Sequence, residues 1–250
     1  MMNKRGQITV FIVVAIVIVL GLLIYFSIRG GLIDRVNVSP EIRPIYNFVD
    51  TCLEEVAEDS IYHIGDNGGY FLYPERSNEV GIPYYFDRGE NLIISKEEVQ
   101  EELGEYVNEM MFFCLENFAR FGDYEVDAGK IDTNVRIIER KVIFNVNYPL
   151  AIKKGESNFL LENFNKEIPS RLNTVYEVAR LITLEQMLDE QNVCINCIGD
   201  FAFENKVFVS MNDYEEDVIV FSIIDREIEI NDEEYVYYFA NRYDLSDAEL

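Results

Sequence analysis

Four cysteines are the residues whose type and spacing could support chemistry in this chain. Cys194 and Cys197 form a Cys-x-x-Cys motif, the spacing found in thiol-disulfide oxidoreductases and in half of many zinc sites. In such an oxidoreductase the first cysteine follows a strand and begins a helix, whose dipole stabilises the thiolate. Here we expect a helix before the motif, and the neighbouring Asp189, Glu190 and Asp200 disfavour a thiolate. The motif therefore favours a structural disulfide in a loop, with a redox pair and a metal site as the alternatives.

Cys52 and Cys114 each occur in a Cys-Leu-Glu sequence, within segments whose apolar residues have helical spacing. We expect the two helices to pack together and a disulfide to join Cys52 to Cys114, as an oxidising exterior permits. Two free buried thiols are the alternative. A zinc site would require these cysteines to converge on Cys194 and Cys197, because the sequence contains no second Cys-x-x-Cys.

The other residue types define no catalytic constellation. His63 is the only histidine, no phosphate-binding glycine loop is present, and 46 acidic residues single out no acid-base pair. We therefore expect no catalytic residue and no cofactor. The acidic runs at residues 212–217 and 231–234 offer oxygen ligands for a weakly bound divalent cation at hairpin tips. They lack the glycine and the distal glutamate of an EF-hand.

An apolar segment at residues 8–26 organises the rest of the chain. Its nineteen residues carry no charge, and a helix of that length spans about 28 Å, close to the hydrocarbon core of a bilayer. We therefore expect a transmembrane helix in contact with the lipid bilayer. Lys4 and Arg5 precede it, and basic residues favour the cytoplasmic side. The prediction is a single-pass cell-membrane protein with a cytoplasmic amino terminus and an extracellular carboxy-terminal domain, held by an uncleaved signal anchor.

The residues Arg5, Gly6 and Gln7 directly precede this apolar segment. This pattern resembles the class III leader of archaeal type IV pilin-like proteins, which a prepilin peptidase cleaves after the glycine. The resemblance implies processing between Gly6 and Gln7. The chain departs from many pilins at Phe11, where they often carry Glu, and Pro40 would interrupt the long helix that packs a filament core.

The composition predicts a compact and strongly acidic domain. Hydrophobic residues make up 49% of the chain, too many for disorder, and the formal net charge is −25. All acidic residues follow residue 30, so this part repels DNA and RNA, and we expect no nucleic-acid partner. The predicted parts are a leader and transmembrane helix, a juxtamembrane linker, and an extracytoplasmic α+β domain with a subdomain split near residue 122. They cover residues 1–30, 31–43 and 44–250.

Apolar periodicity predicts an α+β order of helix pairs and antiparallel β-meanders. The helices are expected at residues 45–64, 96–118 and 170–189, and the two sets of strands at residues 124–168 and 207–240. Ser95 and Glu98 form a capping box at the start of the second helix. Between the first two helices, an aromatic segment at residues 70–86 is expected to be an exposed contact surface. Its contact candidates are Tyr70, Tyr73, Tyr84 and Tyr85.

The leader, the two Cys-Leu-Glu helices, an Ile-Gly-x-x-Gly-Gly-Tyr sequence and the late Cys-x-x-Cys together resemble uncharacterised membrane-anchored proteins of small-genome archaea. The resemblance implies an archaeal cell-surface protein and supplies no mechanism. We therefore expect an extracytoplasmic binding or scaffolding domain with protein partners at the cell surface and without catalysis. One alternative is a pilin-like filament subunit. The other is a surface thiol-disulfide oxidoreductase that uses Cys194 and Cys197.

Overall fold

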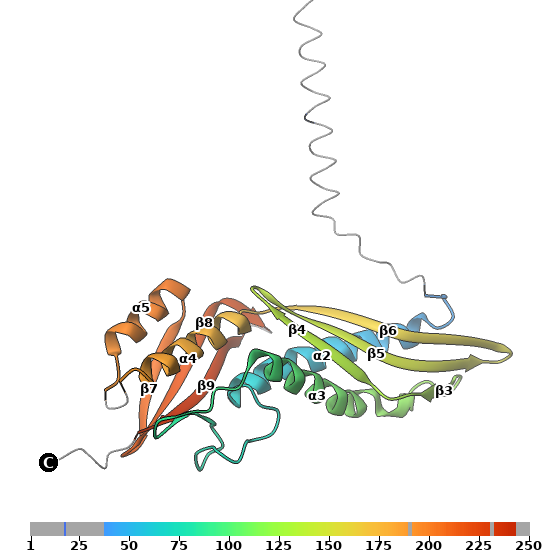
Figure 1. The fold of residues 1–250 in the computed structure, drawn as a ribbon. Helices are drawn as coiled ribbons and strands as arrows, with labels where there is room; N and C mark the ends of the chain where they lie inside the picture. Colours follow the sequence, from blue (N-terminus) through green and yellow to red (C-terminus); the bar gives the residue numbers. More distant parts are fainter. Residues whose placement is uncertain (1–17, 19–37, 190–191, 231–232, 244–250) are drawn as a thin grey trace, which may run out of the picture. The chain divides into compact units, whose positions relative to one another are not determined.

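The computed structural model of the chain describes residues 18, 38–189, 192–230 and 233–243 (Figure 1). The chain divides into two compact units, Met1–Glu41 and Ile42–Leu250, and all of the helices and strands with defined bounds lie in the second. Within the described ranges, no helix is long and apolar enough to cross a membrane. The expected span and its leader residues fall outside the described residues, apart from Ile18.

Two long helices and a four-stranded sheet pack together in the second unit. Helix α2 (Arg43–Asp66) begins with a proline in its first turn, where the missing N–H costs no hydrogen bond. Helix α3 (Lys96–Leu115) begins at the predicted capping box, in which the Ser95 side chain accepts from the backbone N–H of Glu98 and the Glu98 carboxylate accepts from that of Ser95. Each helix buries one apolar stripe, as its periodicity predicts. A 3-10 turn, η1 (Glu116–Phe118), follows α3.

A four-stranded sheet has β5 (Lys141–Lys154) in its middle. Strand β6 (Ser157–Pro169) pairs antiparallel along one edge of β5. On the other edge, β4 (Asp132–Ile138) and β3 (Glu125–Ala128) pair with successive halves of β5. The β5–β6 register shifts at Tyr148-Pro149, where proline has no N–H to give to the ladder.

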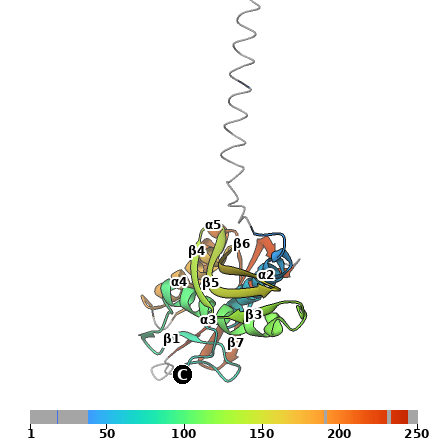
Figure 2. The same ribbon diagram turned by 90° about the vertical axis from the view of Figure 1, so that its right-hand side faces the viewer.

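Helices α2 and α3 pack on this sheet, with α3 against β4 and α2 against β6. In both views α3 lies beneath β4 and β5 (Figures 1 and 2). Gly104 makes the close approach possible, because a Cβ atom there would lie 2.8 Å from the backbone oxygen of Thr133. At the other helix, Lys166 of β6 pairs with Asp50 at 2.9 Å and with Glu54 at 2.8 Å. These contacts hold the helix pair against the sheet.

A five-stranded sheet forms the second half, in the order β2-β1-β9-β8-β7. Its strands are β1 (Tyr84–Asp87), β2 (Glu90–Asn91), β7 (Phe208–Glu215), β8 (Val218–Ile230) and β9 (Glu233–Arg242). Neighbours pair antiparallel except β1, which runs parallel to β9. The α+β class is confirmed. The purely antiparallel meander is a wrong prediction for this sheet, because two strands from between the first two helices, β1 and β2, complete it and β1 pairs parallel with β9.

Two further helices cover the second sheet. Helix α4 (Leu172–Gln186) contacts β8, β9 and β1, and helix α5 (Ile195–Asn205) contacts α4 and β7 (Figure 1). The sequence predicted α4 and missed α5. Only Ile198 of α5 is buried, so this short helix carries no long apolar stripe.

Candidate functional site

The first cysteine pair joins the two long helices. Cys52 and Cys114 form a disulfide with their Cα atoms 5.8 Å apart, so the early part of α2 meets the end of α3. Cys52 is buried, and the bond closes a loop with a sequence separation of 62 residues. The predicted Cys52–Cys114 disulfide is confirmed, and its position between packed helices indicates a structural role.

The second pair, Cys194 and Cys197, also forms a disulfide, with Cα atoms 5.3 Å apart. The sequence predicted that the motif follows a helix and lies in a loop. The preceding helix is present, but the loop is a wrong prediction. Cys194 is the N-cap residue of α5, and its Sγ accepts a hydrogen bond from the backbone N–H of Cys197 at 3.3 Å. The motif thus begins a helix, which is the position of the nucleophilic cysteine in oxidoreductases. Both cysteines are half-buried.

A carboxylate completes this site. The Oε1 of Glu185, on the last turn of α4, lies 3.6 Å from Sγ of Cys197. In the described part of the chain, Glu185, Cys194 and Cys197 are the one group of three metal-ligating side chains, with ligand atoms within 4.8 Å of one another. The four-cysteine zinc site is ruled out in this state, because each cysteine is bonded within its own pair. Nothing in the spacing of the motif indicated Glu185.

The expected aromatic contact surface divides into buried and exposed parts. Tyr84 and Tyr85 belong to β1 and are buried, so their assignment to an exposed surface is wrong. The pairing of β1 with β9 places the ring of Tyr85 against the rings of Tyr237 and Phe239, which explains its burial. Tyr70 is half-buried, and burial raises the pKa of its hydroxyl to about 12. Tyr73 is 65% exposed and remains a contact candidate.

The buried tyrosines should make the fold sensitive to alkali. The hydroxyl of Tyr85 donates to the carbonyl of Gly68 at 3.0 Å and lies 2.5 Å from the hydroxyl of Tyr237. Burial raises the pKa of both hydroxyls, and also that of Tyr235, above the usual value of about 10. Because these folded-state pKa values exceed the unfolded one, the stabilisation is complete below pH about 10 and is lost as the pH rises further.

We therefore expect the free energy of unfolding to fall steadily above pH about 10. A titration from pH 8 to 12.5 should show phenolate absorbance from these tyrosines appearing together with the loss of helical circular dichroism. Replacing both Tyr85 and Tyr237 with Phe should reduce the loss of stability between pH 8 and pH 12.5, so that the variant keeps a larger share of its pH 8 stability at alkaline pH. Constant stability up to pH 12 would contradict the burial described here.

Residues 70–83, here called the aromatic loop, are irregular but tightly hydrogen-bonded. The side chain of Asn78 accepts from the backbone N–H of Ile82 at 2.8 Å and from that of Val80 at 3.2 Å. Gly81 has φ +90°, and a Cβ atom there would lie 2.7 Å from the ring of Tyr73, which therefore rests on the glycine. These contacts fix the tip of the loop.

The base of the aromatic loop is fixed by α2 and α3. The backbone N–H of Phe71 donates to the Glu102 carboxylate at 2.8 Å, and Nε2 of His63 donates to the carbonyl of Phe71 at the same distance. The His63 ring also contacts those of Phe71 and Tyr106. Through these contacts, the single histidine supports the base of the loop.

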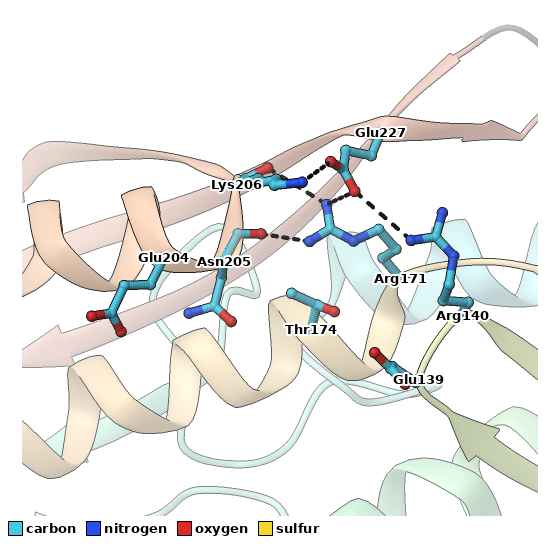
Figure 3. A pocket seen from close by; sticks show the side chains of 8 residues that line it. All are labelled: Glu139, Arg140, Arg171, Thr174, Glu204, Asn205, Lys206 and Glu227. Carbon is cyan, nitrogen blue, oxygen red and sulfur yellow. Dashed lines mark hydrogen bonds and ion pairs between the residues drawn. The ribbon is translucent and has the colours of Figure 1, made fainter.

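A cluster of ion pairs links α4, α5 and β8 around a hollow of about 200 Å³ (Figure 3). Arg171 contacts the Asp225 carboxylate at 2.6 Å and donates to the carbonyl of Asn205 at the end of α5. Glu227 pairs with Arg171 at 3.4 Å and with Lys206 at 3.3 Å. The hydrogen bond from Lys206, followed by the nearby arginine charges, lowers the pKa of Glu227. Glu227 neutralises positive charge of Arg171 and Lys206. The cluster is therefore better suited to holding α4, α5 and β8 together than to binding an anion.

The acidic hairpin tip at residues 212–217 gathers no metal-ligating group of three in the part of the chain that the structure describes. Asp217 instead pairs with Arg88 at 2.7 Å. The other acidic run includes residues 231 and 232, which lie outside the described residues. A weak divalent cation at these tips stays a prediction.

No protein-family model matches the sequence, and no curated protein or solved structure is significantly similar to it. The function is therefore inferred from the geometry and chemistry of the chain's own residues.

Proposed function

We propose that the chain is a single-pass membrane protein whose acidic domain lies outside the cell and binds another protein there. Three features support this proposal. The nineteen apolar residues at 8–26 follow Lys4 and Arg5, as in a signal anchor with a cytoplasmic amino terminus. Two disulfides use every cysteine, which is typical of oxidising compartments. The net charge of −25 favours a solvated, cation-rich exterior.

The observation that carries the binding role is the exposed apolar tip of the aromatic loop. Leu72, Tyr73 and Val80 are 71%, 65% and 58% exposed, although the loop that presents them is fixed by hydrogen bonds. An ordered loop loses little conformational entropy on binding, so its apolar side chains can contribute more of their burial to affinity. Exposed tyrosines with fixed rings are common anchors in protein interfaces.

The charges beside the loop favour a partner with basic residues. Glu75 and Glu79 are exposed beside the apolar tip, and Arg76 is already paired with Glu90. The remaining charge at this surface is therefore negative. We propose a partner protein that covers the apolar tip and surrounds it with basic side chains, whereas anionic lipid headgroups would be repelled.

A photo-crosslinking amino acid at position 73 of the full chain should give a discrete protein adduct in its native membrane. We expect this adduct because a bound partner would lie directly against position 73. Replacing Leu72 and Val80 with Ser should reduce the adduct about tenfold or more, because two interface side chains of this kind contribute about 1 kcal/mol or more each. The measurement is the adduct intensity after irradiation, followed by mass spectrometry.

Position 160 provides the matched control. Leu160 of β6 is 61% exposed and belongs to a different surface, so a crosslinker there should not capture the same protein. Equal adducts from positions 73 and 160, adducts with lipid only, or no adduct at position 73 would each contradict the proposed contact surface.

The sequence Arg5-Gly6-Gln7 supports a second candidate, a pilin-like filament subunit. This function would require removal of the leader, so that the mature protein begins at Gln7. Intact-mass analysis of the native protein separates the two candidates. A mass that includes residues 1–6 favours the anchored binding protein, and a mass that begins at Gln7 favours the filament.

A further inference from the structure

The two disulfides have different surroundings. Cys52–Cys114 lies between packed helices and closes a large loop, which is typical of a structural bond; its Cys52 is buried, and its Cys114 is half-buried with Oε2 of Glu55 4.0 Å from Sγ. Cys194–Cys197 spans three residues, is half-buried, and begins α5. A partly exposed bond at a helix amino terminus is accessible to attack by another thiol.

Local geometry makes the two sulfurs of the second pair unequal. The backbone N–H of Cys197 points at Sγ of Cys194, where it and the helix dipole stabilise a thiolate. The Glu185 carboxylate instead lies 3.6 Å from Sγ of Cys197, where a negative charge favours the protonated thiol. Cys194 is therefore the better leaving thiolate and nucleophile, and Glu185 is placed to accept the proton of Cys197. Asp189 and Asp200, which lie on either side of the motif in the sequence, disfavour a thiolate on both cysteines.

The geometry points to a redox-active Cys194–Cys197 pair that exchanges electrons with a dithiol of another polypeptide, with Glu185 as the proton acceptor for Cys197. The side chains that flank the motif suit a polypeptide. Leu188 and Ile195 are 80% and 58% exposed and offer an apolar approach next to the bond. This activity does not depend on the aromatic loop, so either proposal can fail without the other.

The exchange proceeds in two substitutions at sulfur. A partner thiolate attacks Sγ of Cys194 and forms a mixed disulfide, while the bond to Cys197 breaks and its electron pair leaves on Sγ of Cys197, which takes a proton from water by way of the Glu185 carboxylate. A second partner thiolate then attacks the partner sulfur of the mixed disulfide and releases Cys194 as a thiolate. The partner dithiol loses two electrons and the cysteine pair gains them. In the reverse direction, Glu185 accepts the Cys197 proton as Cys197 attacks Sγ of Cys194 and expels the partner thiolate.

The test uses the full chain in detergent, with dithiothreitol as the dithiol probe. Alkylation and mass spectrometry would follow the opening of each disulfide over time without denaturant. We expect Cys194–Cys197 to open about 100-fold faster than Cys52–Cys114, because both of its sulfurs are partly exposed at the start of a helix, whereas Cys52 is buried between two packed helices. Equal rates, or opening of both bonds only on global unfolding, would overturn the proposal.

The role of Glu185 is tested with Glu185→Gln and with Glu177→Gln, a control on the same helix whose carboxylate pairs with Arg180. Chains with the second pair reduced would react with hydroxyethyl disulfide, a neutral disulfide probe. We expect Glu185→Gln to slow resolution of the mixed disulfide by Cys197 about tenfold and to shift its pH profile upward, because the proton acceptor is lost. The first attack should change about twofold or less, and Glu177→Gln should match the parent. An unchanged resolution rate and pH profile in Glu185→Gln would overturn the assignment of Glu185.

Discussion

Replacing Cys52 and Cys114 together with Ala is expected to lower the free energy of unfolding by about 4 kcal/mol. The disulfide closes a loop with a sequence separation of 62, so its loss restores considerable entropy to the unfolded chain. The bond also fixes the packing of α2 on α3, and α2 in turn contacts the β6 and β9 strands of the two sheets. Chemical denaturation of the full chain in detergent, monitored by circular dichroism, measures the change.

Cys194 and Cys197 provide the matched control for this prediction. Their disulfide spans three residues, so the same loop-entropy relation gives a loss of only about 2 kcal/mol when both are replaced with Ala. The replacement of Cys52 and Cys114 could instead cost no more stability than this control. That result would contradict the claim that closing the long loop is the source of the stabilisation.

Replacing Arg171 with Met is expected to destabilise the fold by about 3–5 kcal/mol, because Asp225 would keep its charge in the interior without a counter-ion. Asp225 is fully buried, and its Oδ2 has no hydrogen-bond partner among the described residues. The guanidinium of Arg171 also donates to the carbonyl of Asn205, the last residue of α5, and the replacement removes this hydrogen bond. The same denaturation measurement applies, with loss of α5 expected to accompany the change.

Two further variants separate charge burial from general damage. Adding Asp225→Asn to Arg171→Met should recover about 2 kcal/mol or more, because the uncompensated charge is removed. Arg180→Met removes an exposed ion pair with Glu177 on the same helix and should cost about 0.5 kcal/mol or less. If Arg171→Met behaves like Arg180→Met, the buried pair does not stabilise the junction of α4, α5 and β8.

Local signals in the sequence were sufficient for the long helices. The spacing of apolar residues and the capping box at Ser95 placed α2, α3 and α4, since each buries one continuous face. The same periodicity placed Cys52 and Cys114 on apolar helix faces, and their pairing followed. These features depend on residues close together in the sequence, which is why pattern alone predicts them.

The missed features depend on contacts between distant residues. Tyr84 and Tyr85 are buried because β1 pairs with β9, about 150 residues later in the chain. Helix α5 is only 11 residues long and buries only Ile198, so its apolar pattern is too short to stand out in the sequence. Glu185 reaches Cys197 because α4 and α5 pack together, which the spacing of the motif does not encode.

Arg171 shows the same limit for charged residues. In a chain with 46 acidic residues, no local pattern identifies Asp225 as its partner 54 positions away. The composition offered one partial signal, because basic residues are few in this chain. An arginine at the start of a helix in so acidic a sequence is a reasonable candidate for a specific role. Only the fold identifies that role.

The most direct test of the account is the side of the membrane on which the domain lies and the state of its cysteines. Intact cells that make the full chain would be treated with external protease and, separately, with a membrane-impermeant thiol reagent before and after reduction. We predict that the protease digests the domain from residue 42 onward and that no cysteine reacts until a reductant is added. A domain protected from the protease, with all four cysteines free, would contradict the proposed location and function together.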